Sequence, residues 1–177
     1  MVAAAAVSVD ALPGASLDRA PRIRAVRAQA DAFVSGASMN KNFGAAPDLR
    51  VDASPTFRAF VRFNADVRSG NVRRVSLLLY SRSRSRRGYQ VRLVEGPWLE
   101  RRITFLNAPS LSPMFILSGP VKARSWKAVD VTSIVDAASG GNDYVSFALT
   151  TRSPNALELA SRETGLHGPH LVVERKD

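Results

Sequence analysis

The stretch Arg58-Ala-Phe-Val-Arg-Phe63 alternates two kinds of side chain with a period of two. Its odd-numbered positions are apolar and share one side of an extended chain, whereas its even-numbered positions are two arginines and Phe60. This alternation is typical of a strand that packs one side on a core and turns the other side outward. The stretch therefore predicts a β-strand with Phe60 on its outer, basic side.

Similar alternation recurs on both sides of this stretch. Segments 49–51, 89–93, 145–149 and 171–173 place apolar residues at every second position. Segment 72–80 is apolar on both sides in its second half, which predicts a strand in the middle of a sheet. The residues that this pattern assigns to the core are Val61, Phe63, Val75, Leu77, Leu79, Val91, Val145, Phe147, Leu149 and Leu171.

Turn-forming pairs such as Gly96-Pro97 and Gly168-Pro169 separate these segments. One short helix is predicted at Thr132–Ala138, capped by Asp130 or Thr132 and ended by Gly140. Many short strands with frequent turns indicate an all-β sandwich or barrel rather than a fold of alternating strands and helices.

Length and composition agree with one domain. A chain of 177 residues with 45% hydrophobic residues can bury a substantial core. It has no cysteine, so neither disulfides nor thiolate metal sites are available. The net charge is +10, which favours anionic partners: an acidic polysaccharide, a nucleic acid or a membrane surface.

The first 28 residues differ from the rest. Their apolar beginning, residues 1–9, is too short to span a bilayer, so we expect no membrane insertion. The segment 1–28 is predicted to be an Ala/Arg-rich leader or linker, either the remnant of a secretory signal or a disordered leader. Its arginines, from Arg19 to Arg27, belong either to a solvated linker or to a recognition arm. The domain itself is expected at residues 29–177.

A series of local phrases runs in order through this domain. They are Asp31-Ala-Phe-Val34, Asn40-Lys-Asn-Phe-Gly44, Leu49-Arg-Val-Asp52, Phe60-Val-Arg-Phe63, Trp98-Leu-Glu100, Ile103-Thr-Phe-Leu-Asn-Ala-Pro109, Val129-Asp-Val-Thr132 and Leu159-Ala-Ser-Arg-Glu163. Their order and spacing resemble the DNRLRE or disaggregatase-related domain family, part of which is classed as carbohydrate-binding module family 96.

This resemblance implies a single antiparallel, jelly-roll-like β-sandwich that is secreted or displayed at the cell surface. It also implies a module that binds an acidic polysaccharide such as alginate and catalyses nothing. The chain departs from the family's usual pattern at Phe105 and Leu106, and at Arg101 and Arg102 in place of small polar residues. These departures leave the fold expectation intact and bear on the ligand.

Basic residues supply the candidate binding site. Arg58 and Arg62 flank Phe60 on the outer side of their predicted strand, and the resemblance makes the strand of Arg50 its neighbour. Such a cluster can clamp carboxylates while the ring packs on a sugar. Lys41 in the adjoining loop and Arg162 complete the predicted ligand-binding set. In the alternative interpretation, these side chains pair with Asp48, Asp52, Glu158 and Glu163 and only solvate the sheet.

Catalysis has little support in the sequence. The two histidines, His167 and His170, flank a Gly-Pro turn, where surface histidines are more common than a metal pair. Glu95 and Glu100 could serve a glycosidase, but the resemblance gives Glu100 a structural role. Trp98 and Trp126 are either packing residues, as their phrases favour, or sugar-stacking platforms.

Three functions remain open: binding of an acidic polysaccharide, a structural or adhesive surface module without a specific sugar site, and non-specific binding of polyanions. Segment Ser81-Arg-Ser-Arg-Ser-Arg-Arg87 resembles a serine-arginine repeat, but it joins two predicted strands and is interpreted as a charged hairpin loop. We therefore expect no specific nucleic-acid partner, and we expect a monomer. No cofactor is required; a structural calcium ion is a weaker expectation, with Asp31, Asp52, Asp130 and Asp143 as its candidate ligands.

Overall fold

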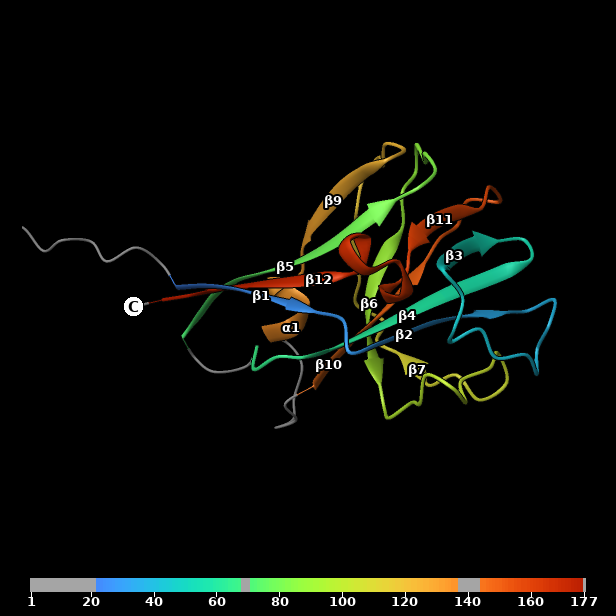
Figure 1. Ribbon diagram of the computed structural model, residues 1–177, viewed down its shortest axis with the longest axis horizontal. Helices are drawn as coiled ribbons and strands as arrows, with labels where there is room; N and C mark the ends of the chain where they lie inside the picture. The colour runs from blue at the N-terminus through green and yellow to red at the C-terminus, as the bar shows by residue number, and fades with distance from the viewer. Residues whose placement is uncertain (1–21, 68–70, 137–143, 177) are drawn as a thin grey trace, which may run out of the picture.

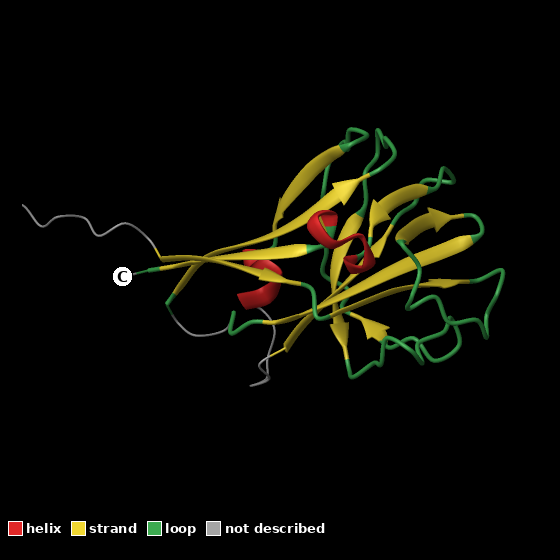
Figure 2. Ribbon diagram, viewed as in Figure 1, coloured by secondary structure: helices red, strands yellow, loops and turns green. Residues whose placement is uncertain are grey.

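The computed structural model describes residues 22–67, 71–136 and 144–176, and these form an antiparallel β-sandwich of two layers (Figures 1 and 2). The all-β prediction is therefore confirmed. The first layer, sheet A, consists of β1 (Arg22–Arg27), β12 (His170–Arg175), β5 (Val72–Ser81), β9 (Ser125–Asp130) and β11 (Leu157–Ala160). The second layer, sheet B, consists of β2 (Ala30–Ser35), β4 (Thr56–Asn64), β10 (Tyr144–Thr150), β6 (Gln90–Glu95) and β8 (Ile116–Leu117), and the short β7 (Ser110–Leu111) pairs separately with the end of β6.

Strand β3 (Asp48–Ala53) connects the two layers. Its first four residues pair with β11 in sheet A, and only Asp52 and Ala53 pair with β4. Arg50 lies in the part that pairs with β11, directly opposite Glu158. Strands β3 and β4 are neighbours, as expected, but their pairing is limited to Asp52 and Ala53, so the residue opposite Arg50 is Glu158 on β11 and not a residue of β4.

The main core lies between the layers, where the alternation placed it. All ten predicted core residues are buried, and Phe63 and Phe147 pack their rings 6.3 Å apart, centroid to centroid. Strand β5 pairs with β12, β9 and β11, which confirms its central position. The period-two pattern succeeded because each strand has one face in this core.

A second, smaller core covers the outer face of sheet B. The segment 96–115 folds across that face and buries Trp98 and Ile103 against Phe60, together with small side chains of β2 and β10. Phe60 does point away from the main core, as predicted, but it is fully buried and cannot offer its ring to a ligand. Local alternation reports the direction of a side chain and not whether a distant segment covers it.

The helix α1 (Thr132–Asp136) begins where predicted. The carboxylate of Asp130 accepts hydrogen bonds from the backbone N–H and the hydroxyl of Thr132, at 3.1 and 2.6 Å. The predicted end of this helix, at Ala138 and Gly140, lies outside the described residues. A 3-10 helix, η1 (Arg162–His167), joins β11 to β12.

The serine-arginine segment is not a hairpin. It follows β5 of sheet A and leads to β6 of sheet B, so it crosses from one layer to the other. Its serines form hydrogen bonds with other parts of the fold. Ser83 Oγ, for example, accepts from the backbone N–H of Glu158 on β11 at 2.9 Å. Its arginines are exposed. The segment is thus a folded connection with a charged surface.

Strand β1 falls inside the segment that was predicted to be a leader. All six of its residues pair with β12, so sheet A includes residues 22–27, which precede residue 29. Among the described residues, no helix has the length and apolar character needed to cross a membrane.

The second core predicts a large effect on stability. We expect Phe60→Ala to lower the free energy of unfolding by about 3–5 kcal/mol, because it leaves a cavity between β4 and the covering segment. Phe115→Ala, which truncates a ring that is 39% exposed, is the control and should cost less than about 1 kcal/mol. Denaturant unfolding measures both, and equal small losses would show that the covering segment is not packed on β4.

Candidate functional site

Arg58 and Arg62 hold the covering segment. The guanidinium of Arg62 donates from Nη1 to the carbonyl of Trp98 at 2.8 Å and lies 5.1 Å from the centroid of that indole ring. The guanidinium of Arg58 lies 4.7 Å from the centroid of Phe105, and burial lowers the pKa of Arg58. Both side chains are half-buried. They emerge beside Phe60 as predicted, but the covering segment lies against them.

Arg92 performs the same task further along the segment. Its Nη1 donates to the carbonyls of Ser112 and Pro113, each at 3.0 Å, and its guanidinium lies 4.7 Å from the ring of Phe115. The sequence reasoning missed Arg92. Its place between two inward positions of segment 89–93 was the available signal, since that places it on the outer side with Arg58 and Arg62.

The remaining predicted arginines and the lysine lie elsewhere. Arg50 is on the outer face of sheet A, 3.6 Å from the carboxylate of Glu158 in a solvent-exposed ion pair. Lys41 is exposed in the loop between β2 and β3, with its ammonium 5.0 Å from the ring of Phe43. The predicted set therefore does not form one groove.

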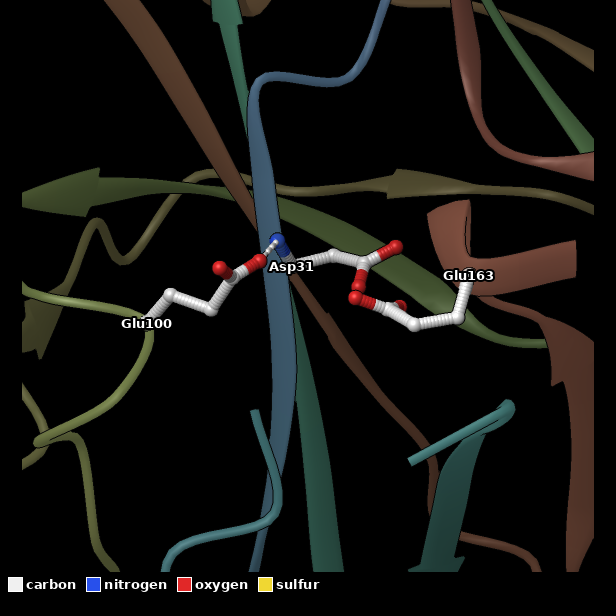
Figure 3. A group of neighbouring side chains, drawn as sticks. All are labelled: Asp31, Glu100 and Glu163. Atoms are coloured by element: carbon white, nitrogen blue, oxygen red, sulfur yellow. Dashed lines mark hydrogen bonds between the residues drawn. The ribbon is translucent and has the colours of Figure 1, made fainter. Parts of the chain in front are cut away.

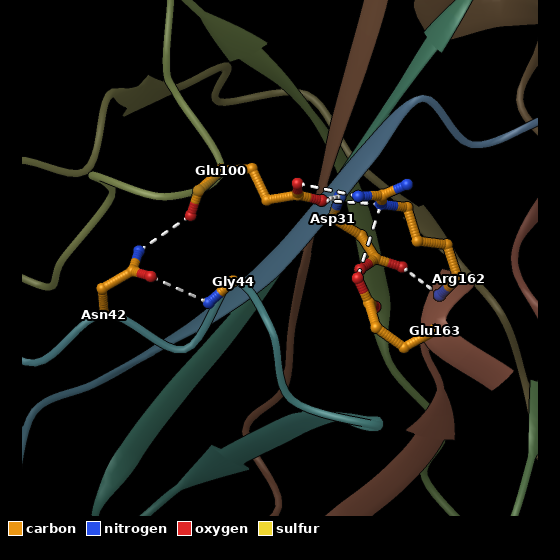
Figure 4. A network of polar contacts seen from close by, with 6 residues as sticks. All are labelled: Asp31, Asn42, Gly44, Glu100, Arg162 and Glu163. Carbon is orange, nitrogen blue, oxygen red and sulfur yellow. Dashed lines mark hydrogen bonds and ion pairs between the residues drawn. The ribbon is translucent and has the colours of Figure 1, made fainter.

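Arg162 belongs to an interlock between three distant segments (Figure 4). Its Nε and Nη2 donate to the two carboxylate oxygens of Glu100 at 2.8 and 2.9 Å. Its backbone N–H donates to Asp31 at 2.7 Å, and the backbone N–H of Asp31 donates to Glu100 at 2.9 Å. Strand β2, the covering segment and η1 thus meet at Asp31, Glu100 and Arg162.

A tight loop completes this interlock. The side-chain amide of Asn42 donates to the carbonyls of Glu100 and Ile103 at 2.8 and 2.7 Å, while its oxygen accepts from the backbone of Gly44 at 3.1 Å. A Cβ at Gly44 would overlap the carbonyl oxygen of Glu100, so only glycine allows this approach. The phrase Asn40-Lys-Asn-Phe-Gly44 is therefore a clamp on the turn that carries Glu100.

Three carboxyl groups converge at the interlock (Figure 3). Those of Asp31, Glu100 and Glu163 each place an oxygen within 4.8 Å of the others. Burial of Asp31 raises its pKa to about 8, aided by the negative charges of Glu163 and Glu100 and opposed by the hydrogen bond and charge of Arg162. Asp31 therefore keeps its proton to a higher pH than an exposed aspartate, and the guanidinium of Arg162 pairs with Glu100 at 2.8 Å and with Glu163 at 3.6 Å.

Among the described residues, Asp31, Asp52 and Asp130 do not belong to one group of converging acids. Asp52 accepts a hydrogen bond from the backbone of Ser54 at 3.2 Å, and Asp130 caps α1 and pairs with Arg74. Asp143 lies outside the described residues. At Asp31, the cation that faces the carboxyl groups is Arg162, whose guanidinium already binds both oxygens of Glu100. These residues fit an ion-pair network better than a calcium site.

The covering segment also forms a hollow of about 340 Å³. It is lined by Pro97, Trp98, Leu99, Arg102, Ile103 and Asn107. The amide of Asn107 is already engaged, since it donates to the carbonyl of Arg102 at 2.9 Å and accepts from the backbone of Thr104 at 2.7 Å. With largely apolar walls and one charged side chain, the hollow offers little to a polyanion.

The outer face of sheet A carries an aromatic group instead. Tyr80 on β5 and Trp126 on β9 are directly opposite each other, with ring centroids 5.5 Å apart. His167 at the end of η1 packs 4.1 Å from Tyr80, and His170 on β12 lies 5.5 Å from Trp126. Of the two tryptophans, Trp98 is buried, as its phrase predicted, whereas Trp126 is 43% exposed. We call these residues the four-ring cluster.

Comparison with known protein families identifies the family to which this fold belongs. The family model for carbohydrate-binding module family 96 matches residues 23–175. The chain belongs to this family. No curated protein matches it. The match begins in β1 and ends in β12, so the family 96 module covers both sheets, the interlock and the four-ring cluster.

The phrases that suggested family 96 are largely explained by the interlock. Asp31, Asn42, Gly44, Glu100 and Arg162 all come from them, and all make the contacts described above. In agreement with the alternative interpretation of the sequence, Arg162 forms ion pairs within the fold, with Glu163 at 3.6 Å and also with Glu100 at 2.8 Å. The phrases describe how a family 96 module closes.

The interlock predicts unequal effects of two equal charge changes. Arg162→Ala should lower the free energy of unfolding by about 2–3 kcal/mol, because it removes two charge-assisted bonds to a largely buried carboxylate. Arg50→Ala, the matched control, removes an exposed pair at 3.6 Å and should cost less than about 1 kcal/mol. Thermal or denaturant unfolding of both variants measures the difference; similar losses would contradict the role given to Arg162.

The raised pKa of Asp31 predicts a dependence of stability on pH. The folded state holds this proton up to about pH 8, whereas the unfolded state releases it near pH 4. The free energy of unfolding should therefore fall as pH rises from about 4 to about 8, by at most about 1.4 kcal/mol per unit. Asp31→Asn keeps an acceptor for the backbone of Arg162 but cannot titrate, so its stability should depend less on pH. Parallel pH profiles for the two proteins would refute the assignment.

Proposed function

We propose that this family 96 module binds an acidic polysaccharide of the uronate type, such as alginate, without catalysis, as a secreted or cell-surface protein. The observation that carries the proposal is uncompensated positive charge on a carbohydrate-binding module. The net charge is +10, and ion pairs engage only a minority of the basic side chains among the described residues. A surface of this kind attracts a polyanion and repels polycations.

The ligand-binding roles of Lys41, Arg50, Arg58, Arg62 and Arg162 stay predictions. The contacts inside the fold favour different roles within the set. Lys41 and the 47% exposed side chain of Arg50 are accessible to a ligand, whereas Arg58, Arg62 and Arg162 have neighbours that hold them. We therefore propose Lys41 and Arg50 as direct contacts, and the other three as residues that position the covering segment and η1.

Arg50 also shares the outer face of sheet A with other basic groups. Its partner Glu158 accepts a backbone hydrogen bond from Arg82 at 2.9 Å, and the side chain of Arg82 pairs with Asp48 at 2.8 Å. Two partly exposed arginine–carboxylate pairs, Arg50–Glu158 and Arg82–Asp48, therefore lie on the side of β5 where Tyr80 is located. The outer face of sheet A is favoured over that of sheet B, which the segment 96–115 covers.

Two competing functions make different predictions. A structural or adhesive module would bind no sugar polymer at physiological salt. A non-specific polyanion binder would bind alginate, heparin and DNA alike, with one steep dependence on salt concentration. The exposed arginines of the serine-arginine segment are the observation that favours the second alternative.

Affinity gel electrophoresis tests the proposal. At about 0.15 M salt, gels with alginate or pectate should retard the protein, and gels with neutral glucan should not. Arg84→Ala, in the serine-arginine segment, should change retardation little. Arg62→Ala carries the same charge change. It should lower the melting temperature clearly and change the retardation little. A loss of affinity at an unchanged melting temperature would instead identify Arg62 as a direct ligand contact. Equal retardation by DNA and alginate would overturn the proposal.

A further inference from the structure

The four-ring cluster is assembled from four separate elements. Strands β5 and β9 bring Tyr80 and Trp126 together as paired residues, while η1 and β12 deliver His167 and His170 to them. In Figure 1, η1 lies against the sheet near the start of β12, which is where the chain must turn to supply both histidines. Such a convergence orients the rings by contacts on several sides.

The indole of Trp126 is held in place and yet remains accessible. It makes edge contacts with Tyr80 at 72° and with His170 at 69°, and 43% of it is exposed. The other tryptophan differs in each respect, since Trp98 is 5% exposed and donates from Nε1 to Ser146 at 3.2 Å. Among the described residues, the indole N–H of Trp126 has no such acceptor. An oriented ring with a free donor suits a polar ligand that also has an apolar face.

Cationic side chains lie at two sides of the four-ring cluster. Arg27 on β1 is directly opposite His170 and is exposed, and within the described parts of the chain it has no carboxylate partner. At the other side, Arg82 follows Tyr80 by two residues, and its side chain is 43% exposed in its pair with Asp48. Among the described residues, Arg27 is thus the cation next to the rings whose charge no carboxylate offsets, while Arg82 contributes a partly exposed pair with Asp48.

We propose that the four-ring cluster is a sugar subsite, in which Trp126 packs against the C–H face of a pyranose ring. Arg27 attracts the carboxylate of a uronate unit, and the exposed imidazole of His167 offers hydrogen bonds to hydroxyl groups. The inference rests on the proposed function and extends it. It names the outer face of sheet A and the residues there that contact the polymer. The subsite lies on the outer face of sheet A. Among the residues of the predicted arginine groove, Arg50 is the one that lies on this face.

Tryptophan fluorescence tests the subsite directly, because the chain has only two tryptophans and one of them is buried. In the free protein, acrylamide should quench mainly Trp126. Saturation with an alginate oligosaccharide should protect this residue and reduce its quenching at least two-fold. Binding that leaves the quenching of Trp126 unchanged would overturn the subsite.

Variants separate the subsite from the proposed function. Trp126→Ala should weaken alginate binding about ten-fold, and Trp126→Phe should restore part of it. Tyr144→Ala removes a ring of similar exposure, 45%, from sheet B and should change binding less than two-fold. Circular dichroism and melting temperature confirm that each variant is folded.

The outcomes distinguish the two ideas. If the wild-type protein binds alginate and Trp126→Ala binds it equally well, the subsite is refuted while the proposed function stands. If Trp126→Ala abolishes binding of a neutral glucan and no uronate polymer binds, the subsite stands and the acidic specificity is refuted. If the wild-type protein binds neither class of polymer, both are refuted.

Discussion

The contact between Arg162, Glu100 and Asp31 is the constraint on which the closure of the sandwich depends. Asp31 is 1% exposed, and a buried carboxyl group is tolerated only when it is protonated or paired. Here, the backbone of Arg162 donates to it while the guanidinium binds Glu100. Residues 69 and 131 positions away from Asp31 are thereby fixed to β2. Strand pairing alone would leave the covering segment and η1 attached only at their ends.

Arginine has two roles in this molecule, and they divide its positive charge. Arg58, Arg62 and Arg92 combine a cation–π contact with an aromatic ring and burial or hydrogen bonds to carbonyl groups, a combination that lysine does not reproduce. They attach the covering segment to sheet B and close that face. The arginines of sheet A and of the serine-arginine segment lie at the surface. Both outer faces of the sandwich therefore carry arginines, but those on sheet A are more accessible to a ligand than those on sheet B.

The strands and the main core could be predicted because period-two alternation is a local property of the chain. The second core could not, because the burial of Phe60 depends on a segment about forty residues away that has no strand pattern. The residue opposite Arg50 could not be predicted for a related reason: β3 pairs with both β4 and β11, and alternation does not say which residues pair with which strand. Arg162 and Glu100 each belong to a family phrase, but no local pattern in the sequence indicates that these two residues pair with each other.

The use of the family phrases limits where ligand specificity can lie. Asp31, Asn42, Gly44, Glu100 and Arg162 are occupied with one another, and the phrase residues Phe60 and Trp98 are buried. A residue engaged in closing the fold cannot change with the ligand without loss of stability. Specificity must then come from side chains that the fold leaves free. On the open outer face of sheet A, these include Trp126 together with Arg27, Tyr80 and His167, the last three of which lie outside the family phrases. The interlock thus supplies a fixed frame, and the outer face of sheet A is the part of this module that it leaves open.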